Sequence, residues 1–400
     1  MLGLGVKKKL KEELERTRLF FQWLAASARE RLKPWPNGRE KIVFALDNDR
    51  LYRDGDNSGR YAYLILNIFS DAGYAVYLHK NIDFATYVGL GKYGRSLYSI
   101  KNLKLVRDLP GRTEDMIYAF DDEQDVRGFL QKRWKKLVYV NTMKSPDWVV
   151  GERLWIPYFM HIYNYSTGQY KRLGELRKNP RKVRVFFGGN LNPDYYQNPA
   201  LRRDYGQMTR LEALNSVRHS DCKVVFLESP KGVFSAMDSG LYSDQCVLLN
   251  GEGWVVAPRH WLGLVSKSDF FLCLSGTDLP MCHHTIEAMA VGAIPILAYP
   301  GWFFPPLRDG VDALVYRDKE ELLKKLDEAL AMKEDEVRTL RENALRYYDS
   351  HLSHESFIRR FESVSGKLMT LMLQPRYVCT EADRLEHPEP KFQELRRKLT

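Results

Sequence analysis

Short apolar segments and longer amphipathic segments alternate along most of the chain. In the first half, apolar residues gather in runs of strand length, and helix-type spacing fills several of the gaps between them. We expect strands at 41–46, 75–79, 115–120, 137–141 and 153–156, and helices at 60–72 and 125–136. Because strands that alternate with helices form parallel sheets, this pattern predicts an α/β domain over residues 37–175.

The second half repeats the alternation and predicts a second α/β domain over residues 181–352. Its strands are expected at 183–187, 223–227, 270–274, 295–298 and 313–315, and its last helices at 319–332 and 334–352. One more helix, at 356–373 within the segment 353–375, is expected to cross back onto the first domain. The highly charged residues 380–400 are predicted to form a loosely held tail.

Residues 1–36 predict a basic amphipathic helix at the N-terminus. Lysines cluster near its start, and apolar residues recur on one side at helical spacing. These apolar residues are Leu10, Leu14, Phe21, Leu24, Ala28 and Leu32. Two interpretations stay open, a helix that lies on a membrane surface and a helix that packs on its own domain.

The charge of the chain narrows the classes of partner. The formal net charge is +10, and residues 1–33 alone contain nine Lys or Arg and four Glu. Half of the positive excess therefore lies in the N-terminal segment. The sequence contains no zinc-finger, helix-turn-helix or RNP-type motif, so nucleic-acid binding ranks behind partners such as phosphorylated substrates and anionic membranes.

The cysteines and the length of the apolar runs indicate the cellular compartment of the protein. The five cysteines form an odd set without C-x-x-C spacing, which favours free thiols in a reducing compartment. No apolar run reaches eighteen residues, and Gln22 interrupts the early apolar segment, so neither a membrane span nor a secretory leader is expected. The predicted location is the cytoplasm, with the inner face of the membrane as a second possibility.

Residues 268–297 carry the most specific pattern in the chain. A buried strand at 270–274 leads into a glycine-containing loop, and a short helix then ends at Gly292 before the next strand. Such a unit places a helix N-terminus at the carboxyl edge of a parallel sheet, where unpaired N–H groups and the helix dipole favour phosphate. His284 and Glu287 lie three residues apart, and so on one face of the helix.

Several motifs occur in an order that resembles a known family. They are Phe186-Phe187-Gly188-Gly189, Arg202-Arg203, the strand Ser268 to Gly276, Glu287-Ala288 and Gly292 to Ile296. In this order and spacing, residues 181–330 resemble the donor half of a GT-B glycosyltransferase, most nearly of the exostosin-like branch. The resemblance implies two Rossmann-like domains that face a cleft, with the nucleotide sugar on the C-terminal domain.

The resemblance also implies roles for individual residues. Glu287 would bind the ribose hydroxyls of the donor, and the loop from Gly276 with the helix N-terminus at His284 would face its phosphates. Gly188 and Gly292 would allow the chain to approach the nucleotide closely. Basic candidates for phosphate contacts are Arg203 and Lys231, together with Arg202 and Arg210.

Two departures from the family pattern leave the substrate and the stereochemistry open. The exostosin-like enzymes often carry Arg where this chain has His284, so a donor with less phosphate charge is one alternative. Retaining GT-B enzymes often carry an acidic residue eight positions before the Glu, where this chain has Leu279.

The first domain supplies the candidates for a catalytic base. The polar loop 47–59 follows a strand directly and is expected to face the acceptor. An inverting transferase needs a general base there, and the candidates are Asp47, Asp49, Asp54 and His161, with Asp56 and His79 behind them. Asp47-Asn48-Asp49 also resembles the metal-binding Asp-x-Asp of GT-A enzymes, but it follows the first strand of the domain, and no metal or other cofactor is expected.

The sequence thus predicts a glycosyltransferase that moves a sugar from a nucleotide sugar to a hydroxyl of a saccharide or lipid-linked acceptor. Synthesis of a surface polysaccharide or glycoconjugate is the expected setting. The alternatives are a GT-B-like epimerase or phosphorylase, and a basic protein without activity that binds membrane surfaces or nucleic acid.

Overall fold

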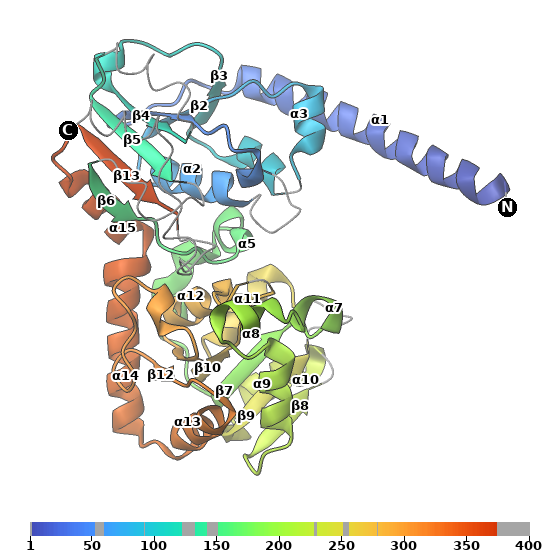
Figure 1. Cartoon of the computed structure of the whole chain (residues 1–400), viewed down its shortest axis with the longest axis vertical. Coiled ribbons are helices and arrows are strands. Elements are labelled where there is room, and N and C mark those ends of the chain that lie inside the picture. Colours follow the sequence, from blue (N-terminus) through green and yellow to red (C-terminus); the bar gives the residue numbers. More distant parts are fainter. Residues whose placement is uncertain are drawn as a thin grey trace. The chain divides into compact units, whose positions relative to one another are not determined.

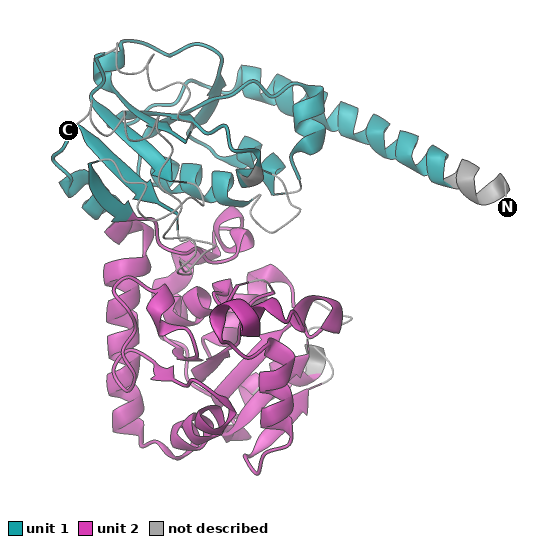
Figure 2. Ribbon diagram, in the orientation of Figure 1, with its two compact units in different colours: residues 1–154, 358–375, 386–400 teal, residues 155–357, 376–385 magenta. Residues whose placement is uncertain are grey.

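The computed structural model describes residues 2–52, 60–91, 93–121, 133–141, 151–227, 230–250, 256–277 and 279–373. These residues divide into two compact units (Figure 2). Unit 1 contains the chain up to Leu154 and again from Ile358, and unit 2 contains Trp155–Phe357. The predicted α/β class with two parallel sheets is confirmed. The predicted tail 380–400 lies outside the described residues.

Unit 1 is built around a seven-stranded sheet with the order β3-β2-β1-β4-β5-β13-β6 (Figure 1). Every neighbouring pair from β3 to β13 runs parallel. The strands are β1 (Lys41–Ala45), β2 (Ala75–His79), β3 (Leu103–Val106), β4 (Met116–Phe120), β5 (Lys136–Asn141), β6 (Glu152–Trp155) and β13 (Leu368–Met372). Its helices are α1 (Leu2–Leu32), α2 (Tyr61–Asp71) and α3 (Phe84–Gly89).

The chain returns to unit 1 near its C-terminal end. The predicted helix at 356–373 is wrong in its second half, since α15 covers only His354–Ser363 and β13 follows as a strand. Met369, Thr370 and Leu371 have no exposed surface, so neighbours cover both faces of the strand. Pairing with β5 in the sheet therefore determines the structure of this segment. Most of the predicted helix 125–136 lies outside the described residues.

Unit 2 contains a six-stranded sheet with the order β12-β11-β10-β7-β9-β8, parallel throughout. Its strands are β7 (Val183–Gly189), β8 (Val224–Leu227), β9 (Tyr242–Asn250), β10 (Ser268–Cys273), β11 (Ile294–Leu297) and β12 (Leu314–Val315). The helices are α5 (Ile162–Ser166), α6 (Leu173–Leu176), α7 (Pro193–Tyr196), α8 (Ala200–Tyr205), α9 (Arg210–Arg218), α10 (Pro230–Ser239), α11 (Pro258–Val265), α12 (His283–Ala290), α13 (Lys319–Ala331) and α14 (Glu334–Tyr347).

The boundary between the units comes earlier in the chain than the predicted 175–181. Residues from Trp155 to Phe357 belong to unit 2, and polar side chains of this segment form hydrogen bonds within that unit. Asn164 donates to Glu287, and Arg177 donates to the carbonyl of Ala290 at the end of α12. Residues 175–181, between the two predicted domains, are thus part of the second unit.

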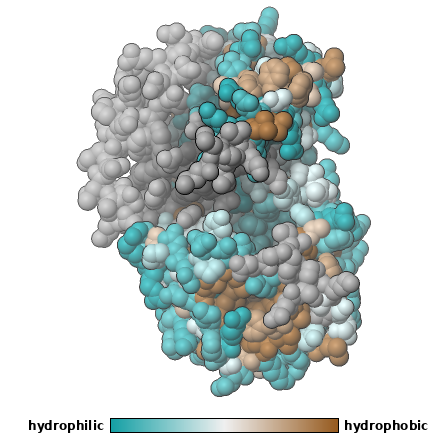
Figure 3. All heavy atoms as spheres, turned by 90° about the vertical axis from the view of Figure 1, so that its right-hand side faces the viewer, coloured by the Kyte–Doolittle hydropathy of each residue, from teal (hydrophilic) through white to brown (hydrophobic). Residues whose placement is uncertain are grey.

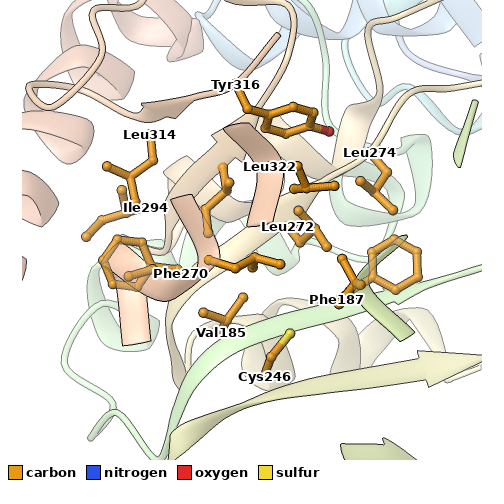
Figure 4. Packing of buried hydrophobic residues seen from close by; sticks show 14 of the residues in the cluster. Val185, Phe187, Cys246, Phe270, Leu272, Leu274, Ile294, Leu314, Tyr316 and Leu322 are labelled. Carbon is orange, nitrogen blue, oxygen red and sulfur yellow. The ribbon is translucent and has the colours of Figure 1, made fainter. Parts of the chain in front are cut away.

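The core of unit 2 lies on one face of its sheet (Figure 4). Val185 and Phe187 of β7 point to the same side because side chains alternate along a strand, and Phe270 and Leu272 of β10 do the same. All four have at most 1% of their surface exposed. Burial of each such side chain contributes roughly 1.5–3 kcal/mol to folding, which fixes the strands whose ends form the site described below.

Both sheets contain a point at which the strand order reverses. In unit 1 the chain moves from β1 to β2 and β3 on one side, and β4 then pairs on the other side of β1. In unit 2, β9 and β10 pair on opposite sides of β7. Loops diverge at such a switch point, and ligands of parallel α/β sheets bind there, beyond the carboxyl ends of the strands. Among the described residues, no helix combines the length and the apolar character needed to cross a membrane.

Candidate functional site

Arg210 lies at the switch point of unit 2 and joins the ends of two strands. It is the first residue of α9, where Thr209 and Glu212 form a capping box that fixes the start of the helix. Its Nε donates to the carbonyl of Ser275, just after β10, at 3.1 Å. Its Nη1 donates to the carbonyl of Asn190, just after β7, at 3.0 Å.

The charge of this guanidinium has no carboxylate partner within ion-pair distance in the described part of the chain. Arg210 is only 2% exposed, and its guanidinium lies 3.8 Å from the centre of the Tyr196 ring. The buried Arg184, by contrast, pairs with Asp269 at 3.2 Å. Because a buried charge is costly unless an opposite charge or strong hydrogen bonds offset it, Arg210 favours an anion at this edge of the sheet.

The N-terminus of α12 and His284 face the same place. Cys282, the N-cap residue, makes no side-chain hydrogen bond to the first turn of this helix. A Cβ atom added to Gly189 would lie 3.3 Å from Nη1 of Arg210 and 3.6 Å from Cε1 of His284. The glycine at the end of β7, the guanidinium and the imidazole therefore meet at one point, where the helix dipole adds partial positive charge.

At the other predicted glycine positions, local structure explains why the residue is glycine. A Cβ on Gly188 would lie 3.1 Å from the Trp261 ring, and a Cβ on Gly276 would lie 2.8 Å from the carbonyl oxygen of Leu279. Gly292 ends α12 with φ +80°, a conformation that side chains other than glycine rarely adopt. It is about 12 Å along the helix axis from the His283 end, since α12 has eight residues.

Glu287 is fully buried, and both of its carboxylate oxygens accept hydrogen bonds from unit 2. Oε1 accepts from the backbone N–H of His161 at 2.9 Å and from Nδ2 of Asn164 at 2.8 Å. Oε2 accepts from the indole of Trp261 at 2.7 Å. Burial raises the pKa of Glu287, and the nearby His284 with the N–H donors of His161 and Trp261 partly opposes that rise.

These bonds give Glu287 a positioning role, because it joins α12 to α5 and α11. Its predicted contact with ribose stays a prediction, since the side chain has no exposed surface and neighbouring groups would have to move to admit a hydroxyl. Sequence reasoning missed Trp261 and Asn164. Only their contacts in the fold single them out.

His161 lies in unit 2 rather than in the first domain, where it was predicted to serve as a base. It is the N-cap residue of α5, and its Nδ1 accepts a hydrogen bond from the backbone N–H of Tyr163 at 3.3 Å. Its ring centre is 5.1 Å from that of His283. His161 thus lies near the start of α12.

The structure separates the predicted basic residues from one another. Arg203 is exposed and pairs with Asp204 at 2.6 Å, and Arg202 pairs with Glu212 at 3.0 Å. Lys231 belongs to α10, but its side chain lies outside the described residues. Of these candidates with described side chains, Arg210 alone lies at the switch point.

One group of potential metal ligands occurs among the described residues. His283, His284 and Glu287 place their ligand atoms within 4.8 Å of one another. Three N–H donors already bind the carboxylate, and Arg210 and the helix N-terminus add positive charge nearby. These surroundings favour an anion over a cation.

The switch point of unit 1 carries a buried carboxylate instead. Asp121 follows β4 and accepts the backbone N–H of Asp47 at 2.7 Å and of Asn48 at 3.1 Å. Burial raises its pKa from 3.8 to about 6, and these two N–H donors partly oppose the rise. Asp121 was missed, although it follows its strand just as Asp47 follows β1.

A polar cavity of about 540 Å³ adjoins this switch point within unit 1. Asp47, Asp49, His79 and Lys80 are among the residues that line it. Nζ of Lys80 lies 3.9 Å from a carboxylate oxygen of each aspartate. Three of the predicted base candidates, Asp47, Asp49 and His79, therefore share one cavity. Asp54 and Asp56 lie outside the described residues.

The sequence matches no family model, and no curated protein matches it. Three solved structures illustrate the structural likeness. Anabaena Alr3699/HepE, in complex with UDP and glucose, is 12% identical, with 81% of this chain and 98% of that chain covered and a TM-score of 0.39. A glycosyltransferase from Rickettsia africae is 9% identical, with 82% and 98% covered and a TM-score of 0.44. The N-terminal domain of Candida albicans trehalose-6-phosphate phosphatase is 10% identical, with 83% and 100% covered and a TM-score of 0.44.

Proposed function

We propose that the chain is a glycosyltransferase of the GT-B type, which binds a nucleotide sugar at the switch point of unit 2. The observation that carries this proposal is the buried Arg210, whose charge has no carboxylate partner within ion-pair distance among the described residues. A donor phosphate would supply the missing negative charge. A nucleoside diphosphate offers more of that charge than a monophosphate and is the expected donor type.

The phosphates would contact three kinds of group. The planar guanidinium of Arg210 matches two phosphate oxygens at once. The N–H groups at the start of α12 and the His284 imidazole donate to the remaining oxygens. This set stabilises the negative charge that grows on the leaving phosphate as the glycosidic bond breaks, so the reaction needs no bound metal.

Glu287 supports this site indirectly in the proposal. By holding His161, Asn164 and Trp261, it keeps α5 and α11 against α12. Rigid support of this kind matters because small displacements of binding groups weaken transition-state contacts.

Unit 1 would bind the acceptor, a saccharide or a lipid-linked sugar. The cavity beside Asp47 and Asp49 offers carboxylates that can accept hydrogen bonds from sugar hydroxyls, and either can act as the general base. His161 and Asp54 stay as further candidates. Transfer to such an acceptor would place the enzyme in the synthesis of a surface polysaccharide or glycoconjugate.

Thermal unfolding in the presence of UDP-, GDP-, CMP- and ADP-sugars tests the donor site. We expect one nucleotide class to raise the Tm of the wild-type chain and to have little effect on Arg210→Gln. Arg203→Gln is the matched control, because Arg203 is exposed and pairs with Asp204. Equal shifts in both variants would reject the assignment of Arg210.

Product analysis then separates transfer from the alternatives. Sugar attached to an added acceptor, with release of the nucleotide, supports the transferase. Interconversion of the donor sugar would indicate an epimerase, and phosphate-dependent cleavage of a glycoside would indicate a phosphorylase. Retention on heparin without any nucleotide-dependent shift would favour the binding protein without activity.

A further inference from the structure

We propose that α1 binds the surface of an anionic lipid membrane through a stripe of exposed apolar residues. This stripe consists of Leu10, Leu14, Phe21, Leu24 and Leu32. The stripe belongs to unit 1, and membrane binding through it is independent of the proposed donor site in unit 2. In Figure 1 the first half of α1 extends beyond the rest of unit 1.

One face of α1 is already used to attach the helix to unit 1. Nε1 of Trp23 donates to the carbonyl of Ile82 at 3.3 Å, and the rings of Phe20 and Trp23 lie 5.2 and 5.7 Å from that of Phe84. Glu30 is 7% exposed and accepts the backbone N–H of Leu105 at 2.9 Å. The second half of the helix is therefore held in a fixed rotation about its own axis.

The apolar stripe lies on the opposite face. At 100° per residue, its five members fall within an arc of about 80°, centred roughly 180° from Glu30. Their exposed fractions are 57% for Leu10, 63% for Leu14, 64% for Phe21, 42% for Leu24 and 86% for Leu32. A helix stabilised by its own domain alone has no need for a second apolar face.

The exposed apolar residues of unit 1 are concentrated rather than scattered. Among the described residues of this unit, every exposed large hydrophobic side chain belongs to α1, to Trp35 just after it, or to Val88 of the adjacent α3. Figure 3 shows the face of the molecule toward which α1 extends in Figure 1. Hydrophobic residues, in brown, lie there beside hydrophilic residues, in teal. Contiguous apolar surface of this kind marks an interaction site.

Charge identifies the partner. Lys11, Arg18 and Arg29 are exposed along one edge of the stripe, and residues 1–33 contain nine basic and four acidic side chains. Basic residues beside an apolar face attract anionic headgroups while the apolar side chains enter the acyl boundary. A second copy of the helix is a less suitable partner, because the same charges repel it. A coiled coil also requires large apolar residues along its whole seam, and Thr17 and Ala28 interrupt them here.

Vesicle flotation with the full chain tests the proposal. We expect co-flotation with phosphatidylcholine vesicles that contain phosphatidylglycerol, and at least tenfold less with phosphatidylcholine alone. Phe21→Glu should reduce binding to the anionic vesicles at least tenfold. Leu241→Glu is the matched control, because Leu241 is an exposed leucine of unit 2, 71% accessible, and this variant should bind like the wild type.

Charge reversal provides a second variant. The double change Lys11→Glu and Arg18→Glu should weaken binding to anionic vesicles and leave the weak binding to neutral vesicles unchanged. The proposal is overturned if wild-type protein floats with neither vesicle, or if Phe21→Glu floats like the wild type. It is also overturned if light scattering shows a dimer that Phe21→Glu dissociates. Nucleotide affinity of Phe21→Glu should match that of the wild type, so failure here leaves the proposed donor site untouched.

Discussion

In unit 1 the switch point of the sheet presents a buried carboxylate, Asp121, whereas in unit 2 the corresponding edge presents a buried guanidinium, Arg210. Backbone groups of the loops surround both charges. Asp121 accepts N–H groups from the loop after β1, and Arg210 donates to carbonyls after β7 and β10. The two sheets thus use the same topological place with opposite charge.

This difference shows that the fold determines the place of a ligand site and that individual side chains determine its chemistry. Parallel topology decides where a ligand can bind, because loops diverge at the switch point. In our proposal, the charge at each edge then selects the ligand: an anion beside the buried Arg210, and sugar hydroxyls beside Asp47 and Asp49 in unit 1.

Removal of the Glu287 carboxylate should have the largest effect. Glu287→Ala leaves three buried N–H donors without an acceptor and opens a cavity, so we expect unit 2 to lose about 4 kcal/mol of unfolding free energy. Urea denaturation followed by tryptophan fluorescence measures the loss. Glu287→Gln, which keeps one acceptor oxygen, should lose less. An unchanged midpoint in Glu287→Ala would refute the positioning role.

Asp121 should make the stability of unit 1 depend on pH. Its pKa in the folded chain, about 6, exceeds the ordinary 3.8, so its stabilising contribution is present below pH 4 and is lost as the pH rises through 6. The loss is roughly 3 kcal/mol. Asp121→Asn has no carboxylate at this position and should lack this pH-dependent loss. The unfolding free energy of the variant, relative to that of the wild type, should therefore increase from pH 4 to pH 7. Urea denaturation at both values checks this, and a constant difference would contradict it.

Arg210→Gln should weaken nucleotide binding by roughly 30-fold, because charge-assisted bonds to a phosphate contribute about 2 kcal/mol. Titration calorimetry with the preferred nucleotide measures the Kd. The variant is to be compared at a temperature where circular dichroism shows it folded, since Arg210 also joins two strand ends. A Kd within twofold of the wild type would exclude a phosphate contact.

His284→Gln should have the smallest effect, a loss of about threefold to tenfold in affinity at neutral pH. Glutamine keeps a neutral donor at the start of α12 but lacks the imidazole, which can take up a proton. The same titration calorimetry measures the Kd, and a Kd equal to that of the wild type would contradict the contact.

Local pattern was sufficient to predict much of the fold. The strand, loop, helix and strand between 268 and 297 occur as expected, because burial of β10 and β11 imposes apolar runs on the sequence. β13 was mistaken for helix, since its pairing partner β5 lies far away in the chain. Local periodicity contains no information about such a partner.

The site was less predictable for the same reason. Arg202, Arg203 and Arg210 look equivalent in the sequence, yet two of them meet carboxylates nearby and the third becomes buried between strand ends. Glu287 was located correctly on α12, but its three donors come from α5 and α11. Roles that depend on distant partners emerge only when the chain is folded.

Hydrogen exchange with and without a nucleoside diphosphate tests the central claim, that the two switch points differ in the ligand they accept. With the nucleotide that raises the Tm most, the account predicts slower exchange at 188–190 and 282–285 in unit 2 and unchanged exchange at 46–52 in unit 1. Slower exchange in the loop after β1, with the start of α12 unchanged, would contradict it.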